Sequence, residues 1–195
     1  MRTSTITRTT KETDISLTLS VLEYGKKGSF TGTSGIGFFD HMLSAFASHG
    51  GFDIQLSCKG DLEVDGHHTV EDVGIVLGTA LKEAAGDMKG IKRFSDIHLP
   101  MDEALVLCAL DFSSRAYLAF DADFRSPMIG GYDSQLTAEF MRALAVNAGI
   151  TLHLKKLCGT NDHHVTEALY KAAGKCIGDA LRIVSDEVMS TKGVL

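Results

Sequence analysis

Two short segments of the chain, "DGHHTVEDVG" and "NDHHVTEALY", share a pattern of two histidines, two spacers and a glutamate, 96 positions apart. In each segment the first histidine and the glutamate are four residues apart, and such residues share one face of a helix. This pair could therefore bind one metal ion, whereas the second histidine points in another direction. Two ions with ligands from several segments are implied. The residues are His67, His68 and Glu71 in the first segment and His163, His164 and Glu167 in the second.

The side-chain types in these motifs indicate which ions they would bind. Imidazole combined with carboxylate suits Mn²⁺, Fe²⁺ or Zn²⁺ better than Ca²⁺ or Mg²⁺. No cysteine is among the candidate ligands, which disfavours a structural zinc site. A single motif of this kind occurs often by chance, and a lone helical histidine is usually an ordinary surface or core residue. Two such motifs at matching places in one chain favour a metal site.

The sequence around the motifs is also repeated. The segment "FDHMLSAFASHGGFDIQLS" aligns with "AEFMRALAVNAGITLHLKK", with apolar residues and a glycine at matching places. The alignment puts Glu139 opposite His41, so each half offers one more side chain able to bind metal. These matches indicate a single domain built from two pseudo-repeats, about 1–92 and 93–195.

Hydrophobic periodicity predicts the elements that must position these residues. Apolar residues at steps of three and four predict helices, and alternating or continuous apolar runs predict strands. In each half the order is strands, helix, strand, helix. We therefore predict an α+β fold of tandem half-domains, each a small mixed sheet covered on one face by helices. The segment 121–134, rich in glycine, aspartate and serine, predicts a flexible loop. The predicted helices span 39–49, 69–85, 135–147 and 165–184.

Composition and charge exclude several classes of protein. The chain has 195 residues, of which 44% are hydrophobic, and this suits one soluble globular domain. A net charge of −6 argues against binding to nucleic acid or to an anionic membrane. The N-terminal segment lacks an apolar signal stretch, and no apolar run approaches the ~20 residues of a membrane span, so we expect a cytoplasmic protein. The four cysteines are expected to be buried, reduced thiols.

Three further histidines have other expected roles. His49 aligns with Asn147, which indicates a local hydrogen bond or a substrate contact. His153 lies in an alternating strand and is expected to be structural. His98 is expected in an exposed turn before Pro100.

Several long motifs resemble a known enzyme family. "GIGFFDHMLSAFASHGGFDI", "DGHHTVEDVGIVLG", "PMDEAL", "ITLHL" and "NDHHVTEALYKA" are similar to segments of the imidazoleglycerol-phosphate dehydratases, hydro-lyases of histidine biosynthesis. The resemblance covers nearly the whole chain, from "TKET" (10–13) to "STKG" (190–193). It implies a homo-oligomer of 24 subunits, two Mn²⁺ ions per active site, and active sites shared between subunits.

The resemblance also implies roles for residues at matching positions. The metal ligands would be His41, His67, His68, Glu71, Glu139, His163, His164 and Glu167. The catalytic carboxylates would be Glu12, Glu71 and Glu167, with Glu12 as the acid–base residue. The substrate contacts would be Glu12, His49, Arg93, Arg115, Lys171, Ser190, Thr191 and Lys192. Glu139 stands where some members have histidine. Ser114 and Ala116 stand where many have glycine and proline, which alters the local loop but leaves Arg115 in place.

The implied reaction explains why such a site would be needed. Dehydration of imidazole glycerol phosphate to imidazole acetol phosphate removes a carbon-bound proton near the ring, with no carbonyl to accept the electrons. One acid–base carboxylate supplies only ~10²–10⁴-fold acceleration, so the ring itself must accept them. Two metal ions on its nitrogens could hold it as imidazolate, and the cationic residues could orient the phosphate. Two other interpretations remain open, a metal-dependent hydrolase and a metal-storage or metal-sensing protein.

Overall fold

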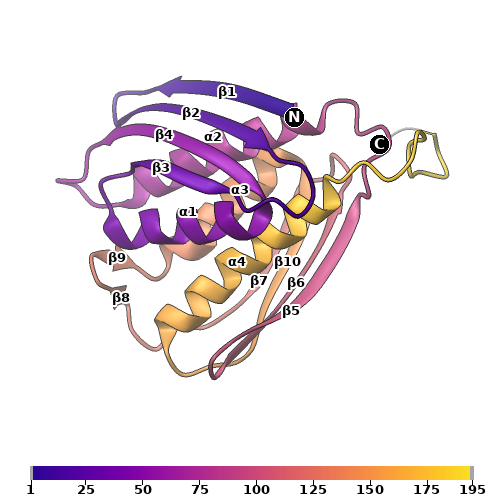
Figure 1. Ribbon diagram of the computed structural model, residues 1–195. Coiled ribbons are helices and arrows are strands. Elements are labelled where there is room, and N and C mark those ends of the chain that lie inside the picture. The colour runs from indigo at the N-terminus through magenta and orange to yellow at the C-terminus, as the bar shows by residue number, and fades with distance from the viewer. Residues whose placement is uncertain (1, 194–195) are drawn as a thin grey trace.

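The computed structural model describes residues 2–193 and has the same order of elements in both halves, apart from two short strands, β8 and β9, that occur only in the second (Figure 1). The first half contains β1 (Arg2–Thr9), β2 (Thr13–Val21), β3 (Ser29–Thr33), α1 (Gly37–Gly50), β4 (Phe52–Gly60) and α2 (His67–Ala85). The second contains β5 (Phe94–Met101), β6 (Ala104–Phe112), β7 (Tyr117–Asp121), β8 (Met128–Ile129), β9 (Tyr132–Asp133), α3 (Leu136–Ala148), β10 (Ile150–Cys158) and α4 (Asp162–Ala180). Within these residues, no helix combines the length and apolar character needed to cross a membrane.

Each half forms a four-stranded mixed sheet with the same topology. The strand order is β1-β2-β4-β3 in the first sheet and β5-β6-β10-β7 in the second. The first two pairings in each order are antiparallel, whereas β3 with β4 and β7 with β10 are parallel. The sheets confirm the predicted duplication.

The helices lie between the two sheets, so the molecule is layered as sheet, helices and sheet (Figure 1). In the first half, α1 packs on β3 and β4 while α2 packs on β1 and β2; α3 and α4 cover the second sheet in the same way. Across the middle, α1 contacts α4 and α2 contacts α3. This arrangement confirms the α+β prediction. It also places each helix that begins with a histidine pair against a helix of the other half.

Alternating burial explains which face of each sheet the helices cover. In β2, Ile15, Leu17 and Leu19 are at most 1% exposed, while the residues between them face away from the core. Burying one such side chain contributes about 1.5–3 kcal/mol. In β6, a central strand, buried residues alternate with half-buried ones. That is why its sequence is nearly continuous in apolar residues.

Two glycines set the distance between α4 and α1. A Cβ atom at Gly174 would lie 2.3 Å from the carbonyl oxygen of Phe46, and one at Gly178 would lie 2.0 Å from that of Gly50. Both positions contact helix backbone, which cannot move aside as a side chain can. The two helices therefore pack this closely only because neither position carries a side chain.

The ends of the predicted helices differ slightly from the observed ones. α1 ends at Gly50, and Gly51 follows in a left-handed conformation with φ of 71°. The segment predicted as helix over 165–184 ends at Ala180 instead. Beyond it, Ile183 turns away from the helix axis and forms a β-bridge with Ile91.

The segment 121–134 is more ordered than the loop predicted from its composition. It contains the short hairpin β8–β9, whose Tyr132 side chain is fully buried. The Tyr132 hydroxyl lies 3.2 Å from the hydroxyls of both Thr137 and Tyr170. Asp162, the first residue of α4, accepts hydrogen bonds from two backbone amides of this segment. The segment is thereby tied to the start of the helix that carries the second histidine pair.

Two smaller predictions are also wrong. His98 does not lie in a turn, because β5 continues through it and pairs it with Leu107. Only two of the four cysteines, Cys108 and Cys176, are buried; the other two lie near the ends of β4 and β10, half-buried and exposed.

Candidate functional site

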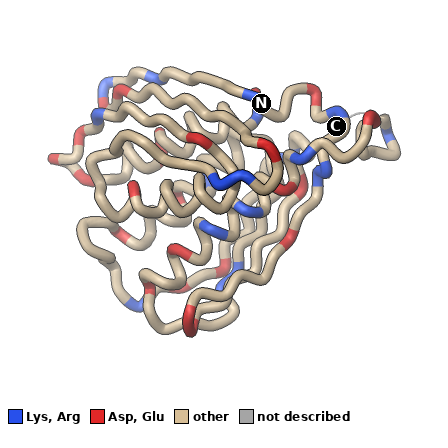
Figure 2. The backbone as a smooth tube through the Cα atoms, viewed as in Figure 1, with Lys and Arg blue, Asp and Glu red and all other residues tan. Residues whose placement is uncertain are grey.

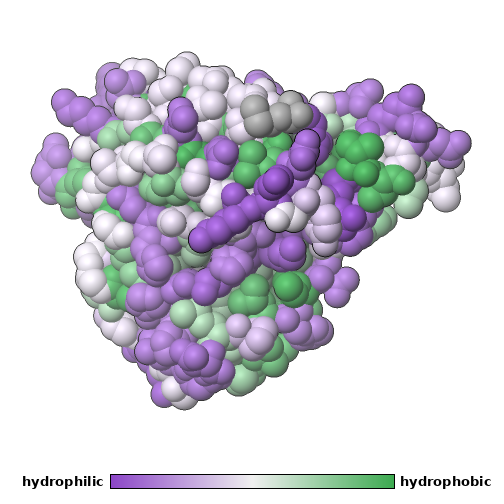
Figure 3. Space-filling view, viewed as in Figure 1, coloured by the Kyte–Doolittle hydropathy of each residue, from purple (hydrophilic) through white to green (hydrophobic). Residues whose placement is uncertain are grey.

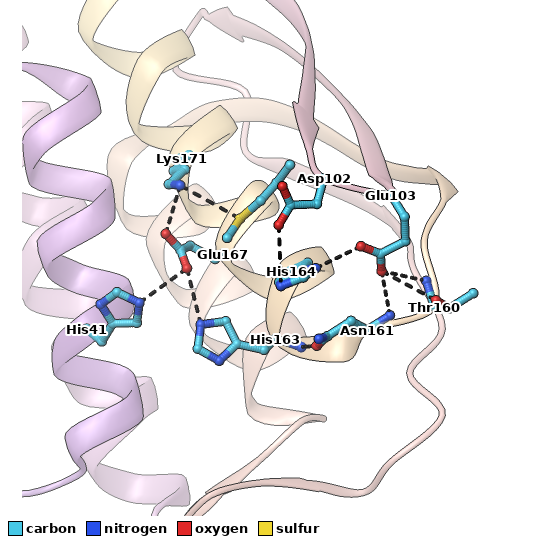
Figure 4. Close-up of polar contacts among 10 residues, drawn as sticks. His41, Asp102, Glu103, Thr160, Asn161, His163, His164, Glu167 and Lys171 are labelled. Carbon is cyan, nitrogen blue, oxygen red and sulfur yellow. Dashed lines mark hydrogen bonds and ion pairs between the residues drawn. The ribbon is translucent and has the colours of Figure 1, made fainter.

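Two helices from different halves bring three predicted ligands together. His41 lies on α1, whereas His163 and Glu167 lie one turn apart on α4. The Nε2 atoms of His41 and His163 are each 3.2 Å from Oε2 of Glu167 (Figure 4). All three ligand atoms lie within 4.8 Å of one another, and no other such group occurs among residues 2–193.

The two nitrogen-to-oxygen distances in this group are compatible with a transition-metal ion. Ligand atoms about 2.1 Å from an ion, placed at right angles around it, are about 3.0 Å apart. The observed nitrogen-to-oxygen distances of 3.2 Å are close to that value. Two imidazoles and a carboxylate also form a donor set that Mn²⁺, Fe²⁺ or Zn²⁺ accepts. A six-coordinate ion would require further ligands from outside this group.

Local packing holds the two imidazoles of this group in place. Phe38 packs edge-on against the His163 ring, with the ring centroids 5.1 Å apart, and its ring centroid is 6.5 Å from that of His41. The Asn161 side chain caps α4 by accepting a hydrogen bond from the His163 amide at 3.0 Å. Such a cap contributes about 1 kcal/mol and fixes the first turn of the helix.

Lys171 is a further predicted site residue on α4, the helix that carries His163 and Glu167. It lies one turn beyond Glu167 and donates a hydrogen bond to Oε1 at 2.7 Å (Figure 4). Burial raises the pKa of Glu167, but Lys171 and His41 outweigh burial and hold that pKa below its ordinary value. Glu167 is therefore an ionised carboxylate with one oxygen toward two imidazoles and the other toward Lys171. Lys171, expected at the substrate phosphate, lies beside the candidate metal group.

In the first half, the second histidine faces carboxylates of its own half. Nδ1 of His68 is 3.0 Å from Oδ2 of Asp61, and its Nε2 is 3.7 Å from Oε1 of Glu12. The hydrogen bond with Asp61 raises the pKa of His68. The ring planes of His67 and His68 are inclined by 88°, and their ring centroids are 6.2 Å apart.

The second half repeats this arrangement with different residues. Nδ1 of His164 is 2.7 Å from Oε2 of Glu103, and its Nε2 is 3.7 Å from Oδ2 of Asp102 (Figure 4). The hydrogen bond with Glu103 raises the pKa of His164. The same bond, with the amides of Asn161 and Thr160, lowers the pKa of Glu103 to about 2.

Three predicted ligands are not gathered within one chain. His67 and Glu71 begin α2, and Glu139 lies on α3, at the places that match the first group. Within the described part of the chain they form no group able to hold a metal ion. Glu139 instead accepts hydrogen bonds from Arg142 on its own helix at 2.7 and 2.8 Å. The duplication therefore produces one group of three ligands within the subunit, whereas the matching residues Glu139, His67 and Glu71 do not come together.

The two arginines expected to bind phosphate converge on one carboxylate. Arg93 donates to both oxygens of Asp111 at 2.7 and 3.1 Å, and Arg115 donates to Oδ2 at 3.2 Å. Arg93 also donates to the carbonyl oxygen of Met189, directly before the predicted substrate contacts at 190–192. The structure thus brings two cations and the C-terminal segment into one region, which the sequence could not show.

His49 lines a cavity of about 590 Å³ at the C-terminal end of α1. Figure 2 shows lysine and arginine on the adjoining β2–β3 loop and on α4, and Figure 3 shows a hydrophilic band across the middle of this face. Burial lowers the pKa of His49, and Lys171, Lys175 and Lys27 lower it further. A neutral imidazole in a wall rich in cations suits contact with an anionic molecule.

Four carboxylates that lie next to predicted site residues were not identified from the sequence, namely Asp61, Asp102, Glu103 and Asp111. A signal existed for two of them, because "PMDEAL" forms the β5–β6 turn and the first half has Glu12 in the matching β1–β2 turn. The other two gave no comparable signal. Their partners lie 7 and 18 residues away: the path of the chain from β4 to α2 brings Asp61 to His68, and the pairing of β5 with β6 brings Asp111 to Arg93.

The fold and these groups define a duplicated α+β protein with a candidate metal centre where its two halves meet. The family model of imidazoleglycerol-phosphate dehydratase matches residues 34–177. Curated relatives with that name are 53% identical in Caldicellulosiruptor saccharolyticus, covering 100% of this chain and 98% of the relative, and 52% identical in Ruminiclostridium cellulolyticum, covering 100% of both. The chain belongs to the imidazoleglycerol-phosphate dehydratase family, which confirms the predicted class of enzyme, a hydro-lyase.

Solved structures of relatives share the whole fold. The crystal structure of the Staphylococcus aureus dehydratase has a TM-score of 0.82 at 34% identity and covers 93% of this chain and 99% of its own. That of the Pyrococcus furiosus enzyme has a TM-score of 0.81 at 40% identity and covers 97% and 100%. The chain therefore spans nearly the full length of both.

Proposed function

We propose that the chain converts imidazole glycerol phosphate to imidazole acetol phosphate by dehydration, a step of histidine biosynthesis. The observation that carries this proposal is the group of His41, His163 and Glu167 in a chain that belongs to a dehydratase family. Two imidazole nitrogens beside one carboxylate oxygen would offer a cation three ligand atoms, which supports the proposal. The cytoplasmic location expected from the sequence stays a prediction.

We further propose Mn²⁺ as the cofactor, with two ions per active site. His41, His163 and Glu167 would hold part of one coordination sphere, since their spacing fits such an ion. Bound ions would supply Lewis acidity to the nitrogens of the substrate ring. The remaining ligands in this proposal are His67, His68, Glu71, Glu139 and His164.

Assembly into a homo-oligomer would complete these ligand sets. Within the described residues neither His68 nor His164 belongs to the group formed by His41, His163 and Glu167. The side chains of both second histidines are partly exposed, by 33% for His68 and 27% for His164. We therefore propose that ligands from neighbouring subunits join in each site, in an assembly of 24 subunits.

Glu12 is proposed as the acid–base residue. The turn that carries it is fixed by its backbone, because its amide donates to Oγ1 of Thr10 and its carbonyl accepts from the Asp61 amide, both at 3.1 Å. Its side chain is 52% exposed and can therefore meet a substrate. In the proposed reaction the hydroxyl on the carbon beside the ring leaves as water, and the Glu12 carboxylate takes the proton from the following carbon, which gives an enol that becomes the ketone. General-base catalysis of this kind contributes ~10²–10⁴-fold.

The arginine region is proposed to hold the substrate phosphate. A phosphate needs several converging cations and donors, and Arg93 and Arg115 already converge on Asp111. Asp111 would keep both guanidinium groups oriented before the substrate arrives. The C-terminal contacts Ser190, Thr191 and Lys192 would add donors, and His49 and Lys171 would meet the substrate from the α4 side. Fixing the phosphate end orients the ring end for proton transfer.

A dehydratase assay combined with metal analysis tests the proposal. Protein stripped with a chelator should form no ketone from imidazole glycerol phosphate, and Mn²⁺ should restore ketone formation. Full activity in metal-free protein would reject the metal dependence. Release of inorganic phosphate without ketone would favour a hydrolase, and Mn²⁺ uptake without turnover would favour a metal-storage or metal-sensing protein.

A further inference from the structure

The second histidine of each pair is held through the same ring atom in both halves. Nδ1 of His68 faces Asp61 at 3.0 Å, and Nδ1 of His164 faces Glu103 at 2.7 Å. The two carboxylates come from different places, since Asp61 follows β4 whereas Glu103 lies in the β5–β6 turn. The same contact is thus made twice by unrelated segments, which indicates that the contact itself matters.

Backbone contacts hold both carboxylates in position. Asp61 is tied to the β1–β2 turn, because its amide donates to the carbonyl oxygen of Glu12 at 3.1 Å. Glu103 uses Oε1 to accept the amides of Thr160 and Asn161 at 3.0 and 2.7 Å. Oε2 of Glu103 is thereby left for the histidine. Neither carboxylate is a freely moving surface group.

We infer that Asp61 and Glu103 are positioning residues that fix His68 and His164 as metal ligands through Nε2. A carboxylate that accepts a hydrogen bond from Nδ1–H leaves the lone pair of the neutral ring on Nε2. It also orients the ring and makes its free nitrogen a stronger donor. This inference rests on the proposed metal-dependent function.

The surroundings of Nε2 agree with this role. In each half Nε2 lies 3.7 Å from a carboxylate oxygen, of Glu12 or of Asp102, which is longer than a hydrogen bond. The histidine side chains are 33% and 27% exposed, so a group from outside the chain can reach them. Each Nε2 therefore lies on a partly exposed side chain, close to the turn that connects the first two strands of its half.

Removal of the two carboxylates tests this inference on the assembled, full-length protein. In Asp61→Ala and Glu103→Ala, Mn²⁺ affinity measured by isothermal titration should fall about 10–100-fold. The electron paramagnetic resonance spectrum of bound Mn²⁺ should change as well. In Asp61→Ala the melting temperature of the metal-free protein should stay close to that of the wild type, which separates a positioning role from a purely structural one. Glu103→Ala also loses the acceptor of the Thr160 and Asn161 amides and should melt at a lower temperature. Glu63→Gln, an exposed carboxylate in the same loop as Asp61, is the control for charge.

Conservative variants of the same two carboxylates make the comparison of Mn²⁺ affinities more specific. Asp61→Asn keeps an oxygen that can accept from Nδ1–H, so its Mn²⁺ affinity should lie between those of the wild type and Asp61→Ala. Glu103→Gln has only one acceptor oxygen for both His164 and the two amides. It should therefore lose nearly as much affinity as Glu103→Ala.

The outcomes separate this inference from the proposed function. Unchanged Mn²⁺ affinity in both alanine variants overturns the inference and leaves the dehydratase proposal in place. A wild-type protein that binds no Mn²⁺ overturns both. If the alanine variants do not fold, Asp61→Asn and Glu103→Gln decide, and wild-type affinity in both of them overturns the inference.

Discussion

His41 and Glu167 are 126 positions apart in the sequence, yet Nε2 of His41 lies 3.2 Å from Oε2 of Glu167. The two residues belong to different halves of the duplication. They meet only because α1 packs against α4. The candidate metal site is therefore a product of the contact between the repeats, and neither repeat contains it alone.

The spacing of these helices should depend on Gly174. In Gly174→Val, the new side chain would collide with the Phe46 carbonyl and force α4 away from α1, which separates His41 from Glu167. We expect a loss of about 1–3 kcal/mol in the free energy of unfolding together with weaker Mn²⁺ binding. Denaturant unfolding and metal titration measure the two effects. Gly37→Ala is the control, since a Cβ atom there would meet nothing within 4 Å. Wild-type behaviour of Gly174→Val would show that the helix spacing is not set at this position.

Glu12→Gln should stop proton transfer while the site stays assembled. The amide cannot act as a base at neutral pH, so turnover should fall about 10²–10⁴-fold. Mn²⁺ content and substrate affinity should change little, because the turn is held by its backbone. Steady-state kinetics and metal analysis on one preparation check this, with Lys11→Ala as the control in the same turn. Normal turnover in Glu12→Gln would assign the base elsewhere.

Removing the Arg115 side chain and removing the Arg93 side chain should affect stability differently. Arg115 is 67% exposed and contacts Asp111 alone among the acidic side chains described, so Arg115→Ala should raise KM about 10–100-fold with little change in stability. Arg93 is 11% exposed and also bonds the backbone near the C-terminal segment, so Arg93→Ala should lower the melting temperature too. Lys82→Ala controls for the loss of an exposed cation. An unchanged KM in Arg115→Ala would remove this residue from the phosphate site.

Asp179 should make stability depend on pH in the acid range. Burial raises the pKa of Asp179, but hydrogen bonds from Lys92, Arg182 and Ser95 outweigh it and hold the pKa below its ordinary value. The stabilisation is therefore complete above the unfolded pKa of about 3.9 and is lost as the pH falls through the lower folded pKa. Asp179→Asn should lose about 1–3 kcal/mol at pH 7.

Denaturant unfolding at several pH values checks this prediction. The difference in unfolding free energy between the wild type and Asp179→Asn should shrink as the pH falls from 6 toward 2. Asp186→Asn, an exposed carboxylate beyond the same helix, should show no such trend. A difference that stays constant with pH would mean that ionisation of Asp179 is not its source.

Local patterns were enough to predict the duplication, the order of the elements and the candidate ligands. Helix and strand periodicities depend on residues close together in the chain, and the histidine pairs are placed at the first turns of α2 and α4 by such local signals. The hairpin in 121–134 was missed because Tyr132 is held by Thr137 and Tyr170, and the latter lies far along the chain. Composition alone does not contain that contact.

Which of the ligands meet was decided by tertiary packing. The repeat made His41 and Glu139 equivalent, yet His41 joins His163 and Glu167 while Glu139 pairs with Arg142. The convergence of the arginines on Asp111 likewise depends on the pairing of strands and on the path of the C-terminal segment. These contacts join residues that no periodicity relates. The meeting of His41 with Glu167 exists because helices pack closely at glycine positions across the two halves, and that packing is a property of the folded chain as a whole.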